Sequence, residues 1–257
     1  MPTRSSIIDG PGGSEPAPPE RSGTESSGAT IGPVHNLTSR VSVPLALLAI
    51  AFAAGFLVLA TVVSRQGSVA FDEPVIAFVT GLGIPPEAWR AVTDLGGGLL
   101  VPIGIGLVLW LLWLRRPAEA IIVAVALIGA SLFNDAVKDL IARPRPPGPH
   151  LAPAAGYSFP SGHTLNSTAT YGLAALYASR SHLALTARRV AFAVLVVIPL
   201  LVGLSRIALG VHYPSDVLGG WLAGMAVVLT VAAIARPTTN ATRAPPGGHP
   251  VALNRLR

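Results

Sequence analysis

The stretch FPSGHTLNST, residues 159–168, opens an apolar run that continues to Ser179. A proline, a glycine and an ionisable histidine stand here at the point where a membrane helix would begin. Polar and ionisable groups inside lipid are costly unless they face a polar interior of the protein. We therefore expect this helix, and the preceding run that ends in FNDAVKDL, to line an internal cavity.

Composition places the chain among membrane proteins. Of its 257 residues, 51% are hydrophobic and 12% are charged, whereas an average soluble domain has about 25% charged residues. The net charge is +6, but the arginines form short clusters beside apolar runs, as in Arg115–Arg116 and Arg188–Arg189. Such clusters indicate membrane topology, so we expect a bilayer and no nucleic acid as a partner. The lack of cysteine excludes disulfides and a thiolate nucleophile.

Six apolar runs predict an all-α fold, a bundle of six transmembrane helices. Polar tails over 1–42 and 237–257 are predicted to be disordered, because they have too little apolar surface to offset the entropy of ordering. The membrane domain is expected over 43–236. The stretch 71–83 is too short to span and predicts an interfacial helix. The six runs are Val43–Val63, Leu95–Leu114, Ala118–Leu140, His163–Ser179, Val190–Leu204 and Val217–Ala235.

Basic residues at the ends of these runs predict the orientation. With the N-terminus in the cytoplasm, most arginines fall in inner loops, as the positive-inside rule requires. Both tails are then cytoplasmic. The outer loops keep four cations that the rule leaves unexplained: Lys138, Arg143, Arg145 and Arg206.

Three polar clusters lie in the outer loops: KDLIARPRP from Lys138, PSGH from Pro160, and SRIALGVHYPSD from Ser205. Lys138, Arg145 and Arg206 bring three cations to one membrane face. Phosphoryl transfer needs such groups, because charge spreads over three equatorial oxygens in the transition state. The clusters therefore predict a phosphoryl-transfer site.

The second cluster has the features of an anion site at a helix N-terminus. Ser161 can cap the helix, and Gly162 lets the backbone approach a ligand closely. The free N–H groups of the first turn attract anions. His163 stands beside them, where a general acid is needed.

The third cluster can orient a nucleophile. His212 precedes Pro214, a favourable first helical residue, and Asp216 follows in the first turn. The carboxylate can accept a hydrogen bond from one imidazole nitrogen and leave the other nitrogen free to attack.

Together the three clusters resemble the signature of the type 2 phosphatidic acid phosphatase family, which joins membrane lipid phosphatases to soluble vanadium haloperoxidases. All eleven signature positions match. The resemblance implies that His212 forms a phosphohistidine, Asp216 orients it, and His163 protonates the leaving oxygen and then activates water. It implies that the phosphate is held by Lys138, Arg145, Ser161, Gly162 and Arg206.

The resemblance and the topology together imply an integral protein of a bacterial cell membrane, with its site at the extracytoplasmic ends of the third to sixth helices. The expected reaction is metal-independent hydrolysis, without a cofactor, of a lipid phosphate or diphosphate. Undecaprenyl diphosphate is the favoured substrate, with phosphatidate or phosphatidylglycerol phosphate as alternatives. A lipid transporter with a cationic pocket and a vanadate-dependent peroxidase are the rival classes. The oligomeric state is left open.

Two further patterns have simpler interpretations. Asp135 and Asp139 flank Lys138 and either tune it or solvate the end of the helix, the second being favoured. Gly220 and Gly224 have the GxxxG spacing that favours close helix packing over catalysis.

Overall fold

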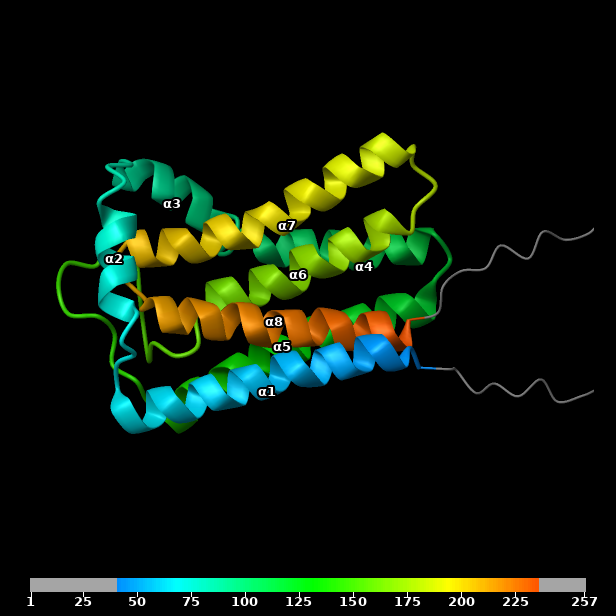
Figure 1. Cartoon of the computed structure of the whole chain (residues 1–257). Helices are drawn as coiled ribbons and strands as arrows, with labels where there is room; N and C mark the ends of the chain where they lie inside the picture. Colours follow the sequence, from blue (N-terminus) through cyan, green and yellow to red (C-terminus); the bar gives the residue numbers. More distant parts are fainter. Residues whose placement is uncertain (1–40, 236–257) are drawn as a thin grey trace, which may run out of the picture. The chain divides into compact units, whose positions relative to one another are not determined.

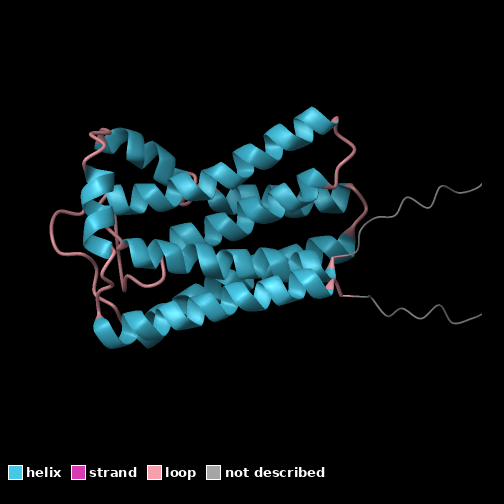
Figure 2. Ribbon diagram, in the orientation of Figure 1, coloured by secondary structure: helices cyan, strands magenta, loops and turns pink. Residues whose placement is uncertain are grey.

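The computed structural model describes residues 41–235, and over that range the chain forms eight helices and no strand (Figures 1 and 2). The predicted tails lie almost wholly outside the described residues, so their disorder stays a prediction. The helices are α1 (Val43–Gln66), α2 (Asp72–Thr80), α3 (Pro86–Asp94), α4 (Leu100–Trp113), α5 (Pro117–Ile141), α6 (Gly162–Ser179), α7 (Leu185–Ala208) and α8 (Pro214–Ile234).

Four of these helices, α1, α5, α7 and α8, are long and apolar enough to cross a membrane. They match four of the six predicted runs. The run predicted from Leu95 becomes helical only at Leu100, because Gly96–Gly98 fold into turns, a conformation that glycine adopts readily. The resulting α4 has 14 residues, about 21 Å at 1.5 Å per residue, so length and composition alone do not establish six crossings.

Helix α6 owes its polar sequence to its surroundings. It packs against α4, α5, α7 and α8, and most of its side chains are buried. Its hydroxyl groups are satisfied locally: Ser167 Oγ and Thr168 Oγ1 both donate to the carbonyl of Thr164. Protein rather than lipid therefore surrounds this helix, which is why its hydropathy falls below that of the four apolar helices.

Small residues let α8 approach α6 closely. A Cβ added at Gly220 would lie 2.9 Å from the carbonyl oxygen of Ser161, and one at Gly224 would lie 2.8 Å from that of Leu165. Gly219 meets the ring of Phe159 in the same way. The prediction that Gly220 and Gly224 mark close helix packing is confirmed.

Four helix ends meet at one end of the bundle, beside α2 and α3 (Figure 1). They are the C-terminal turns of α5 and α7 and the N-terminal turns of α6 and α8. Helix α2 falls within the predicted stretch 71–83, although its position at a membrane interface stays a prediction. No apolar run marks α3, whose nine residues include Glu87, Arg90 and Asp94.

Candidate active site

A cavity of about 320 Å³ lies among these helix ends. Six of the eight predicted site residues line it: Lys138, Arg145, Gly162, His163, Arg206 and His212. They come from α5, the loop after it, α6, α7 and the loop before α8. The other two, Ser161 and Asp216, are fully buried and do not line it.

His212 is held between a carboxylate and a cation. Its Nδ1 lies 3.3 Å from Asp216 Oδ2, and its Nε2 lies 3.2 Å from Arg145 Nη1. Burial lowers the pKa of His212 to about 4, although the Asp216 carboxylate acts in the opposite direction. The imidazole is therefore neutral at ordinary pH, and the nitrogen on the cavity side can act as a nucleophile.

The two arginines of the cavity are held by carbonyl and hydroxyl groups. Arg145 donates to the carbonyls of Val211, Ala155 and Gly156. Arg206 donates from Nη1 to Thr93 Oγ1 at 2.8 Å, and its Nε is buried without a hydrogen-bond partner among the described residues. A buried donor without a partner is costly, so this guanidinium is suited to an anionic ligand.

The PSGH segment begins α6, with Ser161 at the N-cap position. The expectation that the Ser161 hydroxyl caps the helix is wrong, because its side chain makes no capping hydrogen bond and instead accepts one from Thr164 Oγ1. The Ser161 amide donates to the carbonyl of Asp216 at 3.0 Å. This bond joins the first turn of α6, which carries His163, to the first turn of α8.

A glycine turn closes the cavity beside His163. A Cβ added at Gly97 would lie 3.1 Å from His163 Nε2, so the backbone before α4 lies close to the imidazole. Asp135 and Asp139, by contrast, are exposed, which is consistent with solvation of the end of α5.

Sequence reasoning missed a buried ionic network behind His212. Arg143 Nη1 lies 2.5 Å from Asp216 Oδ1, and Arg143 Nη2 lies 2.9 Å from Asp72 Oδ2. Ser158 also donates to Asp216 Oδ2. The doubled Arg-Pro pair at 143–146 hinted at a role for Arg143, but no local pattern pairs it with Asp72, which lies 71 residues away in sequence.

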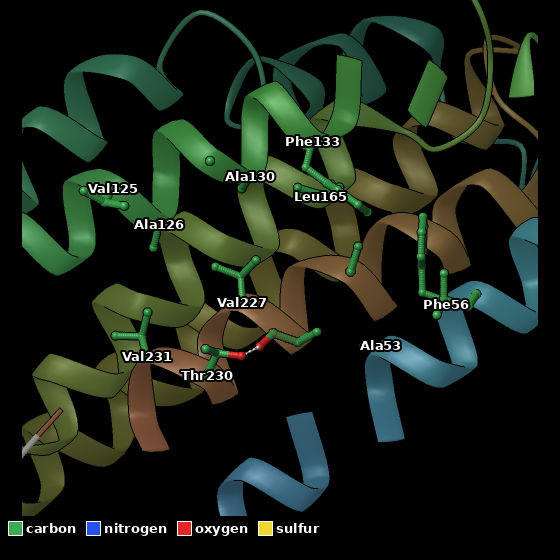
Figure 3. A pocket seen from close by; sticks show the side chains of 14 residues that line it. Ala53, Phe56, Val125, Ala126, Ala130, Phe133, Leu165, Val227, Thr230 and Val231 are labelled. Atoms are coloured by element: carbon green, nitrogen blue, oxygen red, sulfur yellow. Dashed lines mark hydrogen bonds between the residues drawn. The ribbon is translucent and has the colours of Figure 1, made fainter. Parts of the chain in front are cut away.

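Two apolar cavities lie farther from this end of the bundle. One, of about 400 Å³ between α4, α5 and α6, shares Leu100, Val101 and Asn166 with the cationic cavity. The other, of about 450 Å³, lies between α1, α5 and α8 and is lined by residues such as Phe56 and Val227 (Figure 3). It shares no lining residue with the cationic cavity. Of these two apolar cavities, the one between α4, α5 and α6 is therefore the neighbour of the cationic cavity.

Comparisons with known proteins agree with the motifs. The model of the PAP2 superfamily matches residues 119–239. Phosphatidylglycerophosphatase B of Bacillus subtilis (strain 168) is 29% identical over 185 residues, which cover 68% of this chain and 89% of that protein. The region matched by the PAP2 model includes the three clusters.

Two solved structures resemble the fold. The crystal structure of a transmembrane PAP2 type phosphatidylglycerolphosphate phosphatase from Bacillus subtilis is 28% identical, with a TM-score of 0.62, over 72% of this chain and 94% of that one. Aquifex aeolicus LpxE is 23% identical, with a TM-score of 0.52, over 65% of this chain and 98% of that one, a similarity of fold alone. The four apolar helices, the three clusters around one cavity and these relatives lead to one conclusion. The chain belongs to the PAP2 superfamily and is an integral membrane lipid phosphatase.

Proposed function

We propose that this chain hydrolyses a lipid phosphate or diphosphate through a phosphohistidine formed on His212. The observation that carries the proposal is the placement of the His212 ring. Its Nδ1 faces Asp216, and its Nε2 faces a cavity lined by Lys138, Arg145 and Arg206. A phosphate in this cavity would lie against the nucleophile and three cations.

In the first step His212 Nε2 attacks phosphorus, and the bond from phosphorus to the lipid oxygen breaks. His163, which lines the same cavity, gives its proton to the departing oxygen. Asp216 stabilises the positive charge that develops on the His212 ring. In the second step His163 takes a proton from water, and the resulting hydroxide attacks phosphorus and breaks the P–N bond. Inorganic phosphate leaves, and His212 is neutral again.

The lipid tail is proposed to occupy the apolar cavity between α4, α5 and α6. The two cavities share the lining residues Leu100, Val101 and Asn166, which supports a single lipid molecule extending from one into the other. The resemblance of the motifs and the topology favour undecaprenyl diphosphate. The two Bacillus relatives, named for phosphatidylglycerophosphate, instead support phosphatidylglycerol phosphate, and we propose this as the first substrate to test.

We further propose that α4 and α6 complete a six-helix membrane bundle. Helix α6 is shielded by its neighbours, and the turns at 95–99 lengthen the segment that includes α4. The positive-inside rule places the tails in the cytoplasm. The cationic cavity then opens on the extracytoplasmic side of what we propose is a bacterial cell membrane.

The proposal is tested by phosphate release from the purified full chain in detergent. The substrates are phosphatidylglycerol phosphate, phosphatidate and undecaprenyl diphosphate, each assayed with and without excess EDTA. We expect hydrolysis of at least one lipid, retained in EDTA because side chains supply the positive charge. His212→Ala should abolish it.

His182→Ala is the matched control, because His182 is exposed in the loop between α6 and α7. Its activity should equal that of the wild type. Release from none of the lipids, or undiminished release by His212→Ala, would contradict the proposed function. Loss of activity in EDTA that Mg²⁺ restores would contradict its metal-free mechanism.

A further inference from the structure

Arg143 lies outside the cationic cavity, although it is only two residues from Arg145. It is 3% exposed, and all three of its guanidinium nitrogens donate hydrogen bonds. Nε donates to the carbonyl of Gly67, Nη1 to Ser215 Oγ and Asp216, and Nη2 to Asp72. The guanidinium also lies 3.9 Å from the centre of the Tyr213 ring. These bonds use four of its five N–H groups, and Arg143 does not line the cationic cavity.

We propose that Arg143, held by Asp72, is a positioning residue that fixes the Asp216 carboxylate and through it the His212 ring. This inference rests on the proposed function, in which His212 is the nucleophile. It assigns Arg143 and Asp72 a role that none of the three motifs specifies.

The two oxygens of Asp216 have separate tasks. Oδ1 accepts from Arg143 Nη1 at 2.5 Å. Oδ2 faces His212 Nδ1 and also accepts from the amide of Tyr213 and the hydroxyl of Ser158. Because Arg143 occupies Oδ1, the carboxylate cannot rotate without losing a buried ion pair. The oxygen that faces the nucleophile is thus fixed from both sides.

Asp72 secures the other side of the arginine. It is 1% exposed, and its Oδ2 accepts from Arg143 Nη2 and from Ser215 Oγ, while its Oδ1 accepts from the amide of Ser215. Ser215 and Asp216 are adjacent in the first turn of α8. Asp72 and Asp216 therefore share one guanidinium, and the start of α2 is joined to the turn that carries the orienting carboxylate.

The charges of this network also bear on the reaction. Two buried carboxylates face one buried guanidinium, which leaves an excess of negative charge behind His212. Removing the cation would leave two carboxylates uncompensated, and an unpaired buried charge is strongly unfavourable. Asp216 would then rotate or become protonated, and its support for a positively charged His212 ring would be lost.

The test compares Arg143→Gln with wild type on the lipid that wild type hydrolyses. Loss of a partner that orients a metal-binding side chain typically costs 10- to 100-fold in activity, and by analogy we expect kcat to fall by about that factor. KM should change little, because Arg143 does not line the cavity. Arg143→Lys keeps the charge but not the planar fork, so it should recover part of the loss.

Arg90→Gln is the matched control. Arg90 also anchors the loop before α6, through a bond from Nε to the carbonyl of Leu151, but it contacts neither carboxylate. It should keep the wild-type kcat. A second variant, Asp72→Asn, tests the pairing: alone it should lower kcat, whereas added to Arg143→Gln it should raise kcat by removing one uncompensated carboxylate.

A spectroscopic measurement separates this inference from the proposed function. The measurement is proton NMR of protein that carries ¹⁵N-labelled histidine. The Nδ1–H of His212, hydrogen-bonded to Asp216, should give a downfield resonance in wild type, Arg90→Gln and Arg143→Lys. The resonance is assigned by its absence from His212→Gln. It should be lost in Arg143→Gln.

If wild type hydrolyses none of the lipids while this pattern holds, the proposed function fails and the positioning role stands. If folded Arg143→Gln keeps both kcat and the resonance, or if its KM alone changes, the inference is wrong. Additive losses in the Arg143→Gln, Asp72→Asn double variant would also refute it.

Discussion

A methyl group at position 220 should disturb catalysis through packing alone. Gly220→Ala would place a Cβ 2.9 Å from the carbonyl oxygen of Ser161, 3.0 Å from the amide nitrogen of Leu165 and 2.8 Å from Thr164 Cβ. An ordinary contact requires at least 3.4 Å. The first turn of α6 must therefore retreat by about 0.5 Å, because a packed interior has no free volume to absorb the methyl.

This retreat would move His163 away from His212. The Ser161 amide donates to the carbonyl of Asp216, so separation of the two turns also weakens the bond that joins them. Catalytic groups tolerate displacements of about 0.5 Å, and a misplacement of about 1 Å costs roughly 100-fold in rate. We expect kcat to fall about 10-fold, between these limits, and overpacking to destabilise the protein by about 1–3 kcal/mol.

The assay is the initial rate of phosphate release together with thermal unfolding in the same detergent. Gly106→Ala is the control, because a Cβ at this helical glycine of α4 meets nothing within 4 Å. It should leave both kcat and the unfolding temperature near the wild-type values. If Gly220→Ala also keeps the wild-type kcat, the close packing of α6 on α8 does not set the geometry of the site.

Three further predictions follow from the site. His163→Ala should slow phosphatidate hydrolysis by about 10²- to 10⁴-fold and slow undecaprenyl diphosphate hydrolysis less, because an alkoxide leaving group needs a proton more than a phosphate does. Equal losses of the initial rate on both lipids would argue against a general acid. The His212 imidazole should titrate with a midpoint near 4 in histidine NMR of the ligand-free protein, since burial disfavours the charged form. Protonation of His212 should therefore not set an acid limb of kcat/KM near pH 6.5. A midpoint at or above 6.5 would show that Asp216 outweighs burial. In cells, a cysteine at Leu151 should react with an impermeant thiol reagent and one at His182 should not, and the opposite labelling would reverse the orientation.

Local patterns predicted much of the fold because most of its helices are defined locally. Continuous apolar runs gave the positions of α1, α5, α7 and α8 to within a few residues. Helix α3 escaped prediction because it is short and carries three charged residues. The predicted start of α4, Leu95, is too early. Hydropathy does not register that the glycines at 96–98 form turns before the helix begins at Leu100.

The candidate site could be located from sequence because each motif lies at a helix end, where the short linear pattern and the spatial cluster coincide. The supporting residues could not. Asp72 and Arg143 are in contact although they lie 71 residues apart in sequence, and Thr93 accepts a hydrogen bond from Arg206, which is 113 residues away. Each is an ordinary polar residue in its own segment, and only tertiary packing gives it a partner. The roles of the eight motif residues remain predictions for the experiments above.

The position of Leu100, Val101 and Asn166, which line both the cationic cavity and the apolar one, has a consequence for turnover. Once the bond to phosphorus is cut, the two products differ completely in solubility. The lipid product carries less negative charge than the substrate, so the cations hold its head less strongly and it can move sideways into the bilayer between the helices. Inorganic phosphate remains among the cations and can depart only toward water. The products would therefore leave by separate routes, and phosphate accumulating on the water side of the cavity would slow the enzyme more than the less charged lipid that it makes.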